Sequence, residues 1–130
     1  MKIVALCGLL GYGYDQQSLK NAFLEKVDYL GVDAGSTDPG PYYLGSGKSF
    51  TNRTAVKRDL MLALPLAIEN KTPFIIGTAG GAGSKEHVLW LKEIICEIAE
   101  ELSLHFSLGT IYSDVSKEYV LEKLNGDKVK

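Results

Sequence analysis

Short apolar runs alternate along the chain with segments whose apolar residues recur at helical spacing. The short apolar runs at residues 2–7, 28–33, 73–77 and 105–112 predict strands; the first is unbroken, and the last is the weakest because it contains Ser107 and Gly109. Stripes with three- and four-residue spacing predict helices over residues 15–27, 51–71, 85–102 and 114–126. This alternation predicts an α/β fold, a three-layer sandwich around a mostly parallel, Rossmann-like sheet of about four strands.

Local signals support the expected helix boundaries. Asp15, Ser84 and Ser116 stand where a polar side chain can cap a helix N-terminus, and Asn125-Gly126 is typical of a helix end. Pro65 falls inside the second helix, where it removes one backbone hydrogen bond and should bend the helix.

Composition narrows the class of protein. The chain has 130 residues and no internal repeat or linker, which predicts one domain over residues 1–130. A net charge of -2 without a basic cluster argues against a nucleic-acid partner. No run approaches the roughly 20 apolar residues of a membrane span, and the first residues do not read as a signal peptide. With only two cysteines, the sequence favours a cytoplasmic protein.

Several glycine-rich loops follow expected strands. In a parallel sheet the carboxyl ends of the strands share one edge, where ligands of α/β proteins bind. The loop at 34–50 is longer than the usual connection of roughly 2–6 residues, which favours a functional loop forming one wall of a pocket. The facing wall would be the loop at 77–83, and its glycines before a helix are typical of an anion site, although a flexible connection fits equally well.

Two familiar phosphate motifs are not matched. The glycines of residues 8–13 are spaced G-x-x-G-x-G, whereas dinucleotide binding uses G-x-G-x-x-G, so a tight turn explains them better. The segment G-S-G-K-S at 45–49 lacks the first glycine of a P-loop and does not follow the first strand. Lys48 could still meet an anion, or it could be a solvated loop lysine.

Charged residues near this edge are candidates for chemistry. Asp33 ends the second strand and Asp38 follows five residues on; each could move a proton or bind Mg²⁺, and each could instead form an Asx turn. Whether a cofactor is used is open. Arg58 could hold a carboxylate, or be an ordinary surface arginine. Because adjacent helical residues diverge by about 100°, Arg58 and Asp59 are not expected to point in one direction.

The string D-x-G-S-x-D-x-G-P-x-x-L-G from Asp33 to Gly45, then R-D-L at 58–60 and P-F-I-I-G-T-A-G-G-A-G at 73–83, resembles the N-terminal part of acyclic terpene utilisation (AtuA-like) proteins. The resemblance covers about residues 2 to 125. It implies an α/β fold with a site near Asp33, Ser36, Asp38, Arg58, Asp59 and the 77–83 loop. Family members are usually longer, so the resemblance implies a chain corresponding to their N-terminal portion.

These observations lead to two functional hypotheses. The first is a metabolic enzyme, or an enzyme subunit, acting on a small carboxylate or acyl thioester at the carboxyl edge of the sheet. The second is a non-catalytic module that binds a ligand or completes a site with another polypeptide. In either case we expect a homo-oligomer or a partner subunit, because a parallel sheet needs cover on both faces. The candidate catalytic residues are Asp33, Asp38 and Arg58, and the candidate ligand- or anion-binding residues are Gly35, Ser36, Lys48, Gly77, Gly80, Gly81, Gly83, Ser84 and His87.

Overall fold

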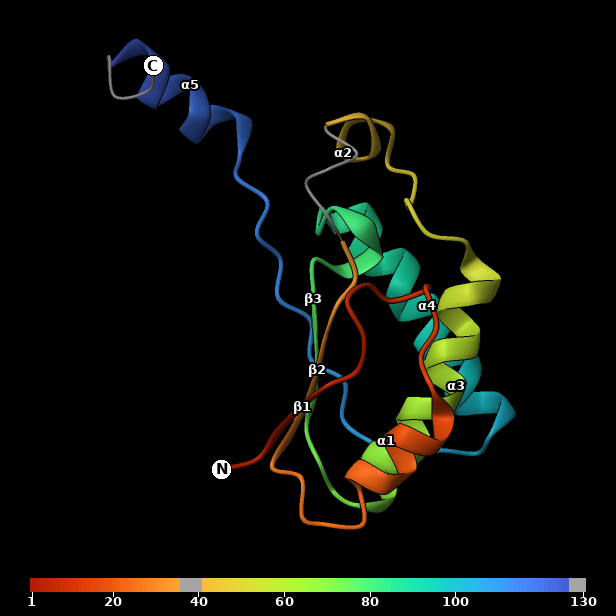
Figure 1. The fold of residues 1–130 in the computed structure, drawn as a ribbon. Coiled ribbons are helices and arrows are strands. Elements are labelled where there is room, and N and C mark those ends of the chain that lie inside the picture. The colour runs from red at the N-terminus through yellow and green to blue at the C-terminus, as the bar shows by residue number, and fades with distance from the viewer. Residues whose placement is uncertain (36–40, 127–130) are drawn as a thin grey trace.

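Three short strands form a parallel sheet in the order β1-β2-β3 (Figure 1). The computed structural model describes residues 1–35 and 41–126, and in it β1 is Ile3–Ala5, β2 is Tyr29–Asp33 and β3 is Phe74–Gly77. Leu30, in the central strand, is in register with Val4 of β1 and Phe74 of β3. The fold is therefore mixed α/β, as the sequence predicts, with a parallel sheet.

Three helices cover one face of this sheet. They are α1 (Gln16–Ala22), α3 (Arg53–Glu69) and α4 (Lys85–Glu101), which lie on the same side of the strands in Figure 1. The direction of winding explains this for α1 and α3: connections between parallel strands are almost always right-handed, and the steps from β1 to β2 and from β2 to β3 run the same way along the sheet, so both connecting helices lie on one face. Smaller elements are α2 (Tyr42–Ser46), the 3₁₀ turn η1 (Ala79–Gly81) and α5 (Lys117–Asn125).

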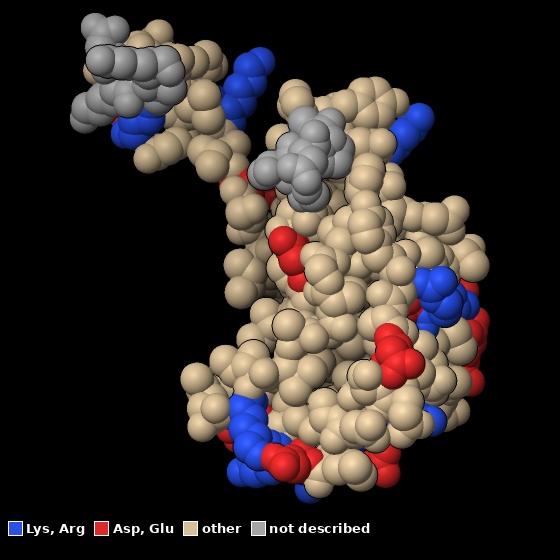
Figure 2. Space-filling view, viewed as in Figure 1, with Lys and Arg blue, Asp and Glu red and all other residues tan. Residues whose placement is uncertain are grey.

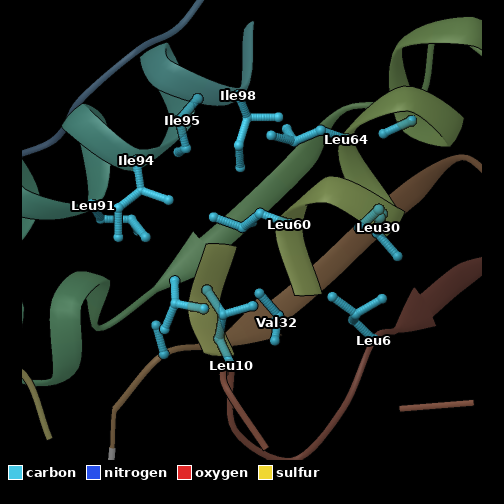
Figure 3. Packing of buried hydrophobic residues seen from close by; sticks show 14 of the residues in the cluster. Leu6, Leu10, Leu30, Val32, Leu60, Leu64, Leu91, Ile94, Ile95 and Ile98 are labelled. Atoms are coloured by element: carbon cyan, nitrogen blue, oxygen red, sulfur yellow. The ribbon is translucent and has the colours of Figure 1, made fainter. Parts of the chain in front are cut away.

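The core lies between the sheet and these helices (Figure 3). In β2, Leu30 and Val32 are buried toward the helices, whereas Tyr29 is 40% exposed on the opposite face. The helices contribute most of the other apolar side chains, among them Leu60, Leu64, Leu91, Ile94, Ile95 and Ile98. The other face of the sheet stays open, with Ile3 62% and Ile75 59% exposed.

The observed fold is simpler than the expected one. The described residues form three strands, and residues 105–112, expected as a fourth strand, are extended chain outside the sheet. The described helices also supply one covering layer rather than two. The run at 105–112 is interrupted by a serine and a glycine, and in the structure Phe106, Leu108 and Ile111 remain partly or largely exposed. Burial is thus too limited to hold it as a strand.

The first helix is shorter than expected, and the second contains its proline as expected. The first ends at Ala22, five residues before the predicted end at residue 27, because Phe23 and Leu24 close it with turn hydrogen bonds to Leu19, Lys20 and Asn21. Helix α3 runs through Pro65 without interruption from Arg53 to Glu69. No helix among the described residues combines the length and apolar character needed to cross a membrane.

The chain after α4 leaves the body of the molecule. It passes beside β3 and ends in α5, which stands apart from the rest in Figures 1 and 2. In Figure 2 the charged side chains lie mainly around the margins of this view, and the area over the strands is largely uncharged. Helix α5 exposes Tyr119, Val120, Leu121 and Leu124, each at least 41% accessible. An apolar helix surface and an apolar sheet face are therefore both uncovered.

Candidate functional site

The loops after all three strands meet at the carboxyl edge of the sheet. The amide of Leu10 donates to the carbonyl of Asp33 at 2.8 Å, and the amide of Ala34 donates to the carbonyl of Gly77 at 2.9 Å. These bonds extend the strand pairing by a residue or more into the loops. They bring together the segments at 9–14, 33–35 and 77–84, as the parallel topology predicts.

The second and third of these loops pack directly on each other at Gly35. A Cβ at this position would lie 2.2 Å from the Gly81 carbonyl oxygen and 2.3 Å from a methyl of Thr78. Only glycine fits such an approach, so the two loops are neighbours, as expected. They touch at this point, however, and leave no room there for the anion that was expected between them.

The segment at 48–50 forms the next layer over the glycine loop. The amide nitrogen of Phe50 would be 3.2 Å from a Cβ at Gly81, whose φ is +109°. The carbonyl of Lys48 accepts a hydrogen bond from Nε2 of His87 at 3.0 Å. Lys48 therefore enters the site through its backbone, and this bond fastens the 41–52 segment to α4.

Aromatic side chains anchor the same segment on its other side. The rings of Tyr43 and Phe50 pack edge to face with centroids 5.3 Å apart, and Phe50 lies 6.4 Å from Tyr12 in the loop after β1. Tyr42 packs edge to face on Tyr43 at 5.2 Å. The described part of the long loop, residues 41–50, thus packs against the other loops at this edge of the sheet, as its tyrosines suggest, and it contains a short helix, α2, that the sequence did not predict.

Asp33 takes up the turn conformation that was its alternative interpretation. Its Oδ1 accepts the amide of Gly35 at 3.0 Å, which is an Asx turn. The side chain is nevertheless exposed at the end of β2. One carboxylate oxygen therefore holds the turn, and the residue stays accessible at the edge where ligands of α/β sheets bind.

Asp59 is the buried carboxylate of this region. It is 0% exposed, and its Oδ2 accepts the amides of Gly11 and Gly13 at 2.8 and 3.0 Å. Its Oδ1 receives Nε and NH2 of Arg58 at 2.9 and 2.7 Å. The expectation that these adjacent residues point apart is wrong, because the long arginine side chain curls back to its neighbour.

The carboxylate of Asp59 also affects two nearby groups. Burial first, and then the negative charge of Asp59, raise the pKa of the Cys7 thiol and the pKa of the Tyr14 hydroxyl. The Tyr14 hydroxyl donates to the Asp59 backbone carbonyl at 2.6 Å. Both groups are therefore held in their neutral forms, as members of a structural network that fixes the loop after β1.

The start of α4 holds a second polar cluster. Nδ1 of His87 lies 2.6 Å from Oγ of Ser84, and Oγ lies 3.1 Å from Oε2 of Glu86. The amide of Lys85 donates to Oδ1 of Asp114, at 3.2 Å, in the segment before α5. A carboxylate of the chain itself thus occupies the helix N-terminus at which an anion was expected.

A pocket of about 620 Å³ opens beside β3, between α3, α4 and the extended segment at 105–111. Its apolar lining comes from one stripe of α4, Val88, Leu91 and Ile95, and in equal part from α3, from β3 and from the extended segment. Ala79 of the glycine loop lines it at the carboxyl edge of the sheet. His105, for which the sequence suggests no role, is also among its lining residues.

The structure thus divides the predicted site into two groups. Gly35, Gly80, Gly81, Ser84, His87 and the Lys48 carbonyl come together around the glycine loop, whereas Arg58 is tied to Asp59 and the loop after β1. Gly77 and Gly83 belong to the ends of the same glycine segment. Ser36 and Asp38 lie outside the described residues, so the magnesium site at Asp33 and Asp38 stays a prediction.

Sequence reasoning missed two features. Ser84 and His87 are three residues apart on one helix, a spacing that brings side chains together, and this signal could have identified them as a pair. No local pattern could have connected Asp114 with Lys85, because 29 residues separate them.

In the part of the chain that the structure describes, no group of three or more His, Cys, Asp or Glu side chains is arranged to hold a metal ion.

Comparison with protein-family models, with curated proteins and with solved structures gave no match. The similarity to AtuA-like proteins therefore stays a prediction from the sequence motifs.

Proposed function

We propose that this protein binds a small acyl compound, a carboxylate or an acyl thioester, and acts on it as an enzyme or enzyme subunit. The observation that carries this proposal is the pocket of about 620 Å³ beside β3, which reaches the carboxyl edge of the sheet at Ala79. Ligand pockets commonly have volumes of about 300–1,000 Å³, with mainly apolar walls and a few polar groups. This pocket has both properties.

The shape of its lining suits an acyl chain with a polar head. Val88, Leu91 and Ile95 give one continuous apolar stripe, and Lys71 and Lys92 are the cationic residues of the lining. Burying each methylene of a ligand is worth about 0.8 kcal/mol, so affinity should rise with chain length until the pocket is full. A negatively charged head would then favour the end nearest a lysine or the edge of the sheet.

Asp33 and Arg58 keep the roles proposed from the sequence, but each is already engaged in a hydrogen bond within the chain. Asp33 would act as acid, base or metal ligand through the oxygen that the Gly35 amide does not engage. Arg58 would hold a carboxylate only if it shared its guanidinium with Asp59, to which Nε and NH2 are already bonded. Neither residue lines the pocket, so a ligand would reach them only by extending beyond it along the carboxyl edge of the sheet. The AtuA-like resemblance implies a site near both residues and leaves the reaction open.

Titration calorimetry tests the proposal. We expect binding of octanoate or octanoyl-CoA, with weaker binding of acetate or acetyl-CoA, with or without Mg²⁺. Val88→Phe, which adds bulk to the pocket wall, should weaken octanoate binding by about tenfold or more, whereas Leu89→Phe, one residue on and outside the lining, should not. Absence of binding across this panel, or equal effects of the two substitutions, would contradict the proposal.

A second candidate function, binding of another polypeptide, is favoured by the uncovered surfaces. The sheet exposes Ile3, Tyr29 and Ile75, and the projecting α5 exposes its own apolar side chains. We propose a second copy of the chain as the partner, since reciprocal packing of α5 on the open sheet face would bury both surfaces at once. Such an assembly would supply the third layer of the Rossmann-like sandwich that the sequence suggests.

Light scattering after size-exclusion chromatography measures this association. We expect a dimer that dissociates on Leu121→Asp, because a charge on α5 opposes burial of its apolar surface. Glu122→Asp on the same helix is the matched control and should leave the dimer intact. A strict monomer at high concentration would rule out the second copy as the partner.

A further inference from the structure

Ser84 and His87 form a close pair at the start of α4. The Oγ of Ser84 lies 2.6 Å from Nδ1 of His87, and Nε2 of the same ring lies 3.0 Å from the carbonyl oxygen of Lys48. His87 is 1% exposed, whereas Ser84 is partly accessible. A buried imidazole therefore connects a hydroxyl that solvent can reach with a fixed backbone carbonyl.

The hydrogen-bond partners define the tautomer of His87. A backbone carbonyl can only accept, so Nε2 must carry the proton that it shares with Lys48. In the neutral ring Nδ1 is then an acceptor, so Nδ1 of His87 and Oε2 of Glu86 both face the single hydroxyl proton of Ser84, and the reactive arrangement is the one in which that proton points to Nδ1. This is the arrangement of a hydroxyl nucleophile beside a base whose orientation a third group maintains.

Helix capping does not account for the position of this hydroxyl. Asp15, Asn52 and Ser116, the N-caps of α1, α3 and α5, each accept a backbone amide of their own helix with the side chain. Ser84 occupies the same position of α4 but makes no side-chain bond of this kind. Its hydroxyl faces the imidazole instead, and the first amide of the helix is bonded by Asp114.

The glycine loop keeps the base in place. A Cβ at Gly80 would lie 2.4 Å from the backbone oxygen of His87 and 2.7 Å from its Cβ, so the loop packs directly against this residue. Together with the Lys48 carbonyl, this contact limits movement of the imidazole. A catalytic base needs such rigid support, because misplacement by about 1 Å can cost about 100-fold in rate.

We propose that Ser84 is a nucleophile and His87 its general base, and that the pair hydrolyses an acyl ester or thioester. This inference deepens the proposed function and rests on it for the substrate class. Ala79 and Val88, which line the apolar pocket, lie within five residues of Ser84 on either side. Ser84 itself is not among the lining residues, so an acyl chain must extend one helical turn beyond Val88 to bring its carbonyl group to the hydroxyl.

Each step balances with water as the second reactant. Oγ of Ser84 attacks the carbonyl carbon while its proton moves to Nδ1 of His87. The tetrahedral intermediate collapses, the bond from carbon to sulfur or oxygen breaks, and the leaving group takes the proton from Nδ1. Water then attacks the acyl-serine, gives its proton to Nδ1, and the serine leaves with that proton, so the products are a carboxylic acid and a thiol or alcohol.

Two nearby groups bear on the reaction. The carboxylate of Glu86 lies 3.1 Å from Oγ of Ser84 and is a second acceptor for the hydroxyl proton, so it competes with Nδ1 of His87 for the proton that the base must take. The amide of Lys85, the residue after the nucleophile, is the natural donor to the oxyanion. Asp114 holds this amide at 3.2 Å, so a substrate carbonyl would displace a carboxylate of the chain itself.

The direct test is covalent labelling of the folded protein with diisopropyl fluorophosphate, followed by mapping of modified serines by mass spectrometry. The serine attacks phosphorus and fluoride leaves, so no acyl pocket is needed. We expect Ser84 to react about 100-fold faster than Ser116, an N-cap serine without a histidine partner, which is an internal control. Unfolding in urea should remove this preference.

Variants separate the base from the nucleophile. Ser84→Ala should abolish the adduct, and His87→Gln should slow it by about 100-fold while circular dichroism reports an intact fold. Equal labelling of Ser84 and Ser116 in the wild-type protein would overturn the inference even if His87→Gln failed to fold. Turnover of p-nitrophenyl octanoate, lost in Ser84→Ala, is expected alongside.

The two proposals fail in different ways. If Ser84 is labelled but octanoate and octanoyl-CoA do not bind, Ser84 is still a nucleophile and the acyl-binding proposal is wrong. If these ligands bind but Ser84 is not labelled selectively, the acyl-binding proposal holds and Ser84 is not the nucleophile.

Discussion

Replacement of Asp59 by alanine should cause one of the largest losses of stability available at a polar position of this protein. The carboxylate is 0% exposed and accepts the amides of Gly11 and Gly13 together with two nitrogens of Arg58. These bonds tie the loop after β1 to the middle of α3. Alanine removes every one of them and leaves both glycine amides without an acceptor.

The contacts give the size of the effect. A hydrogen bond to a charged group contributes about 1.5–3 kcal/mol, so the two amide bonds together are worth about 3–6 kcal/mol. Removing a buried charge recovers part of its desolvation cost, and water can reach the half-buried loop. We therefore expect a net loss of about 3 kcal/mol, a large share of the roughly 5–15 kcal/mol by which such domains are stable.

Arg58→Ala is the matched control because it removes the other partner of the same carboxylate. The Arg58 side chain is 55% exposed, so solvent screens its ion pair and the expected loss is about 1 kcal/mol. Urea unfolding followed through the single Trp, Trp90, gives both values. With a slope of about 2 kcal/mol per molar urea, the midpoint should fall by about 1.5 M for Asp59→Ala and about 0.5 M for Arg58→Ala. A midpoint for Asp59→Ala that is equal to or higher than that for Arg58→Ala would refute the conclusion that Asp59 anchors the loop after β1.

Two further predictions concern the glycine loop and the surface of α4. Gly80 and Gly47 both have left-handed φ angles, +69° and +66°, so the strained backbone alone makes alanine cost about 1 kcal/mol at each position. At Gly80 the added Cβ would also lie 2.4 Å from the backbone oxygen of His87, whereas at Gly47 it would meet no backbone atom. Thermal unfolding should therefore show a clearly larger loss for Gly80→Ala, and equal losses would mean that the loop does not pack on α4. Hydrogen bonds from Lys57 and Arg53 lower the pKa of the Glu97 carboxyl in the folded protein. Ionised Glu97 therefore stabilises the fold at pH values above its unfolded-state pKa, and this stabilisation is lost as the pH falls through its folded-state pKa. The melting temperature of Glu97→Gln should thus lie below that of the wild type at pH near 7 and converge with it in acid, whereas the exposed Glu93→Gln should show no such convergence.

Much of the candidate site follows from local sequence patterns. Apolar runs ending at Asp33 and Gly77, each followed by glycines, place the two loops at one edge of a parallel sheet. The structure confirms that they are neighbours, with Gly35 against Gly81. The role of Asp33 in a turn was one of the two interpretations that its position allowed.

Contacts between distant segments could not be read in this way. The pairing of Arg58 with Asp59 depends on side-chain rotamers, and the bonds of Asp59 to Gly11 and Gly13 join residues nearly fifty positions apart. The bond from Lys85 to Asp114 depends on the path of a long extended segment. Periodicity describes which face of an element is apolar, but it carries no information about which distant polar group meets which.

The sequence by itself determined the alternation of strands and helices, the parallel order that follows from it, and the apolar stripes of α3 and α4, because these depend on side-chain spacing within one element. Only the tertiary structure decided that all three covering helices lie on one face, that residues 105–112 stay outside the sheet, and that a pocket opens beside β3. These features depend on the direction in which successive crossovers step and on competition for the same buried surface. The packing of one element against another depends on such long-range contacts, which the residue spacing within a single element does not specify.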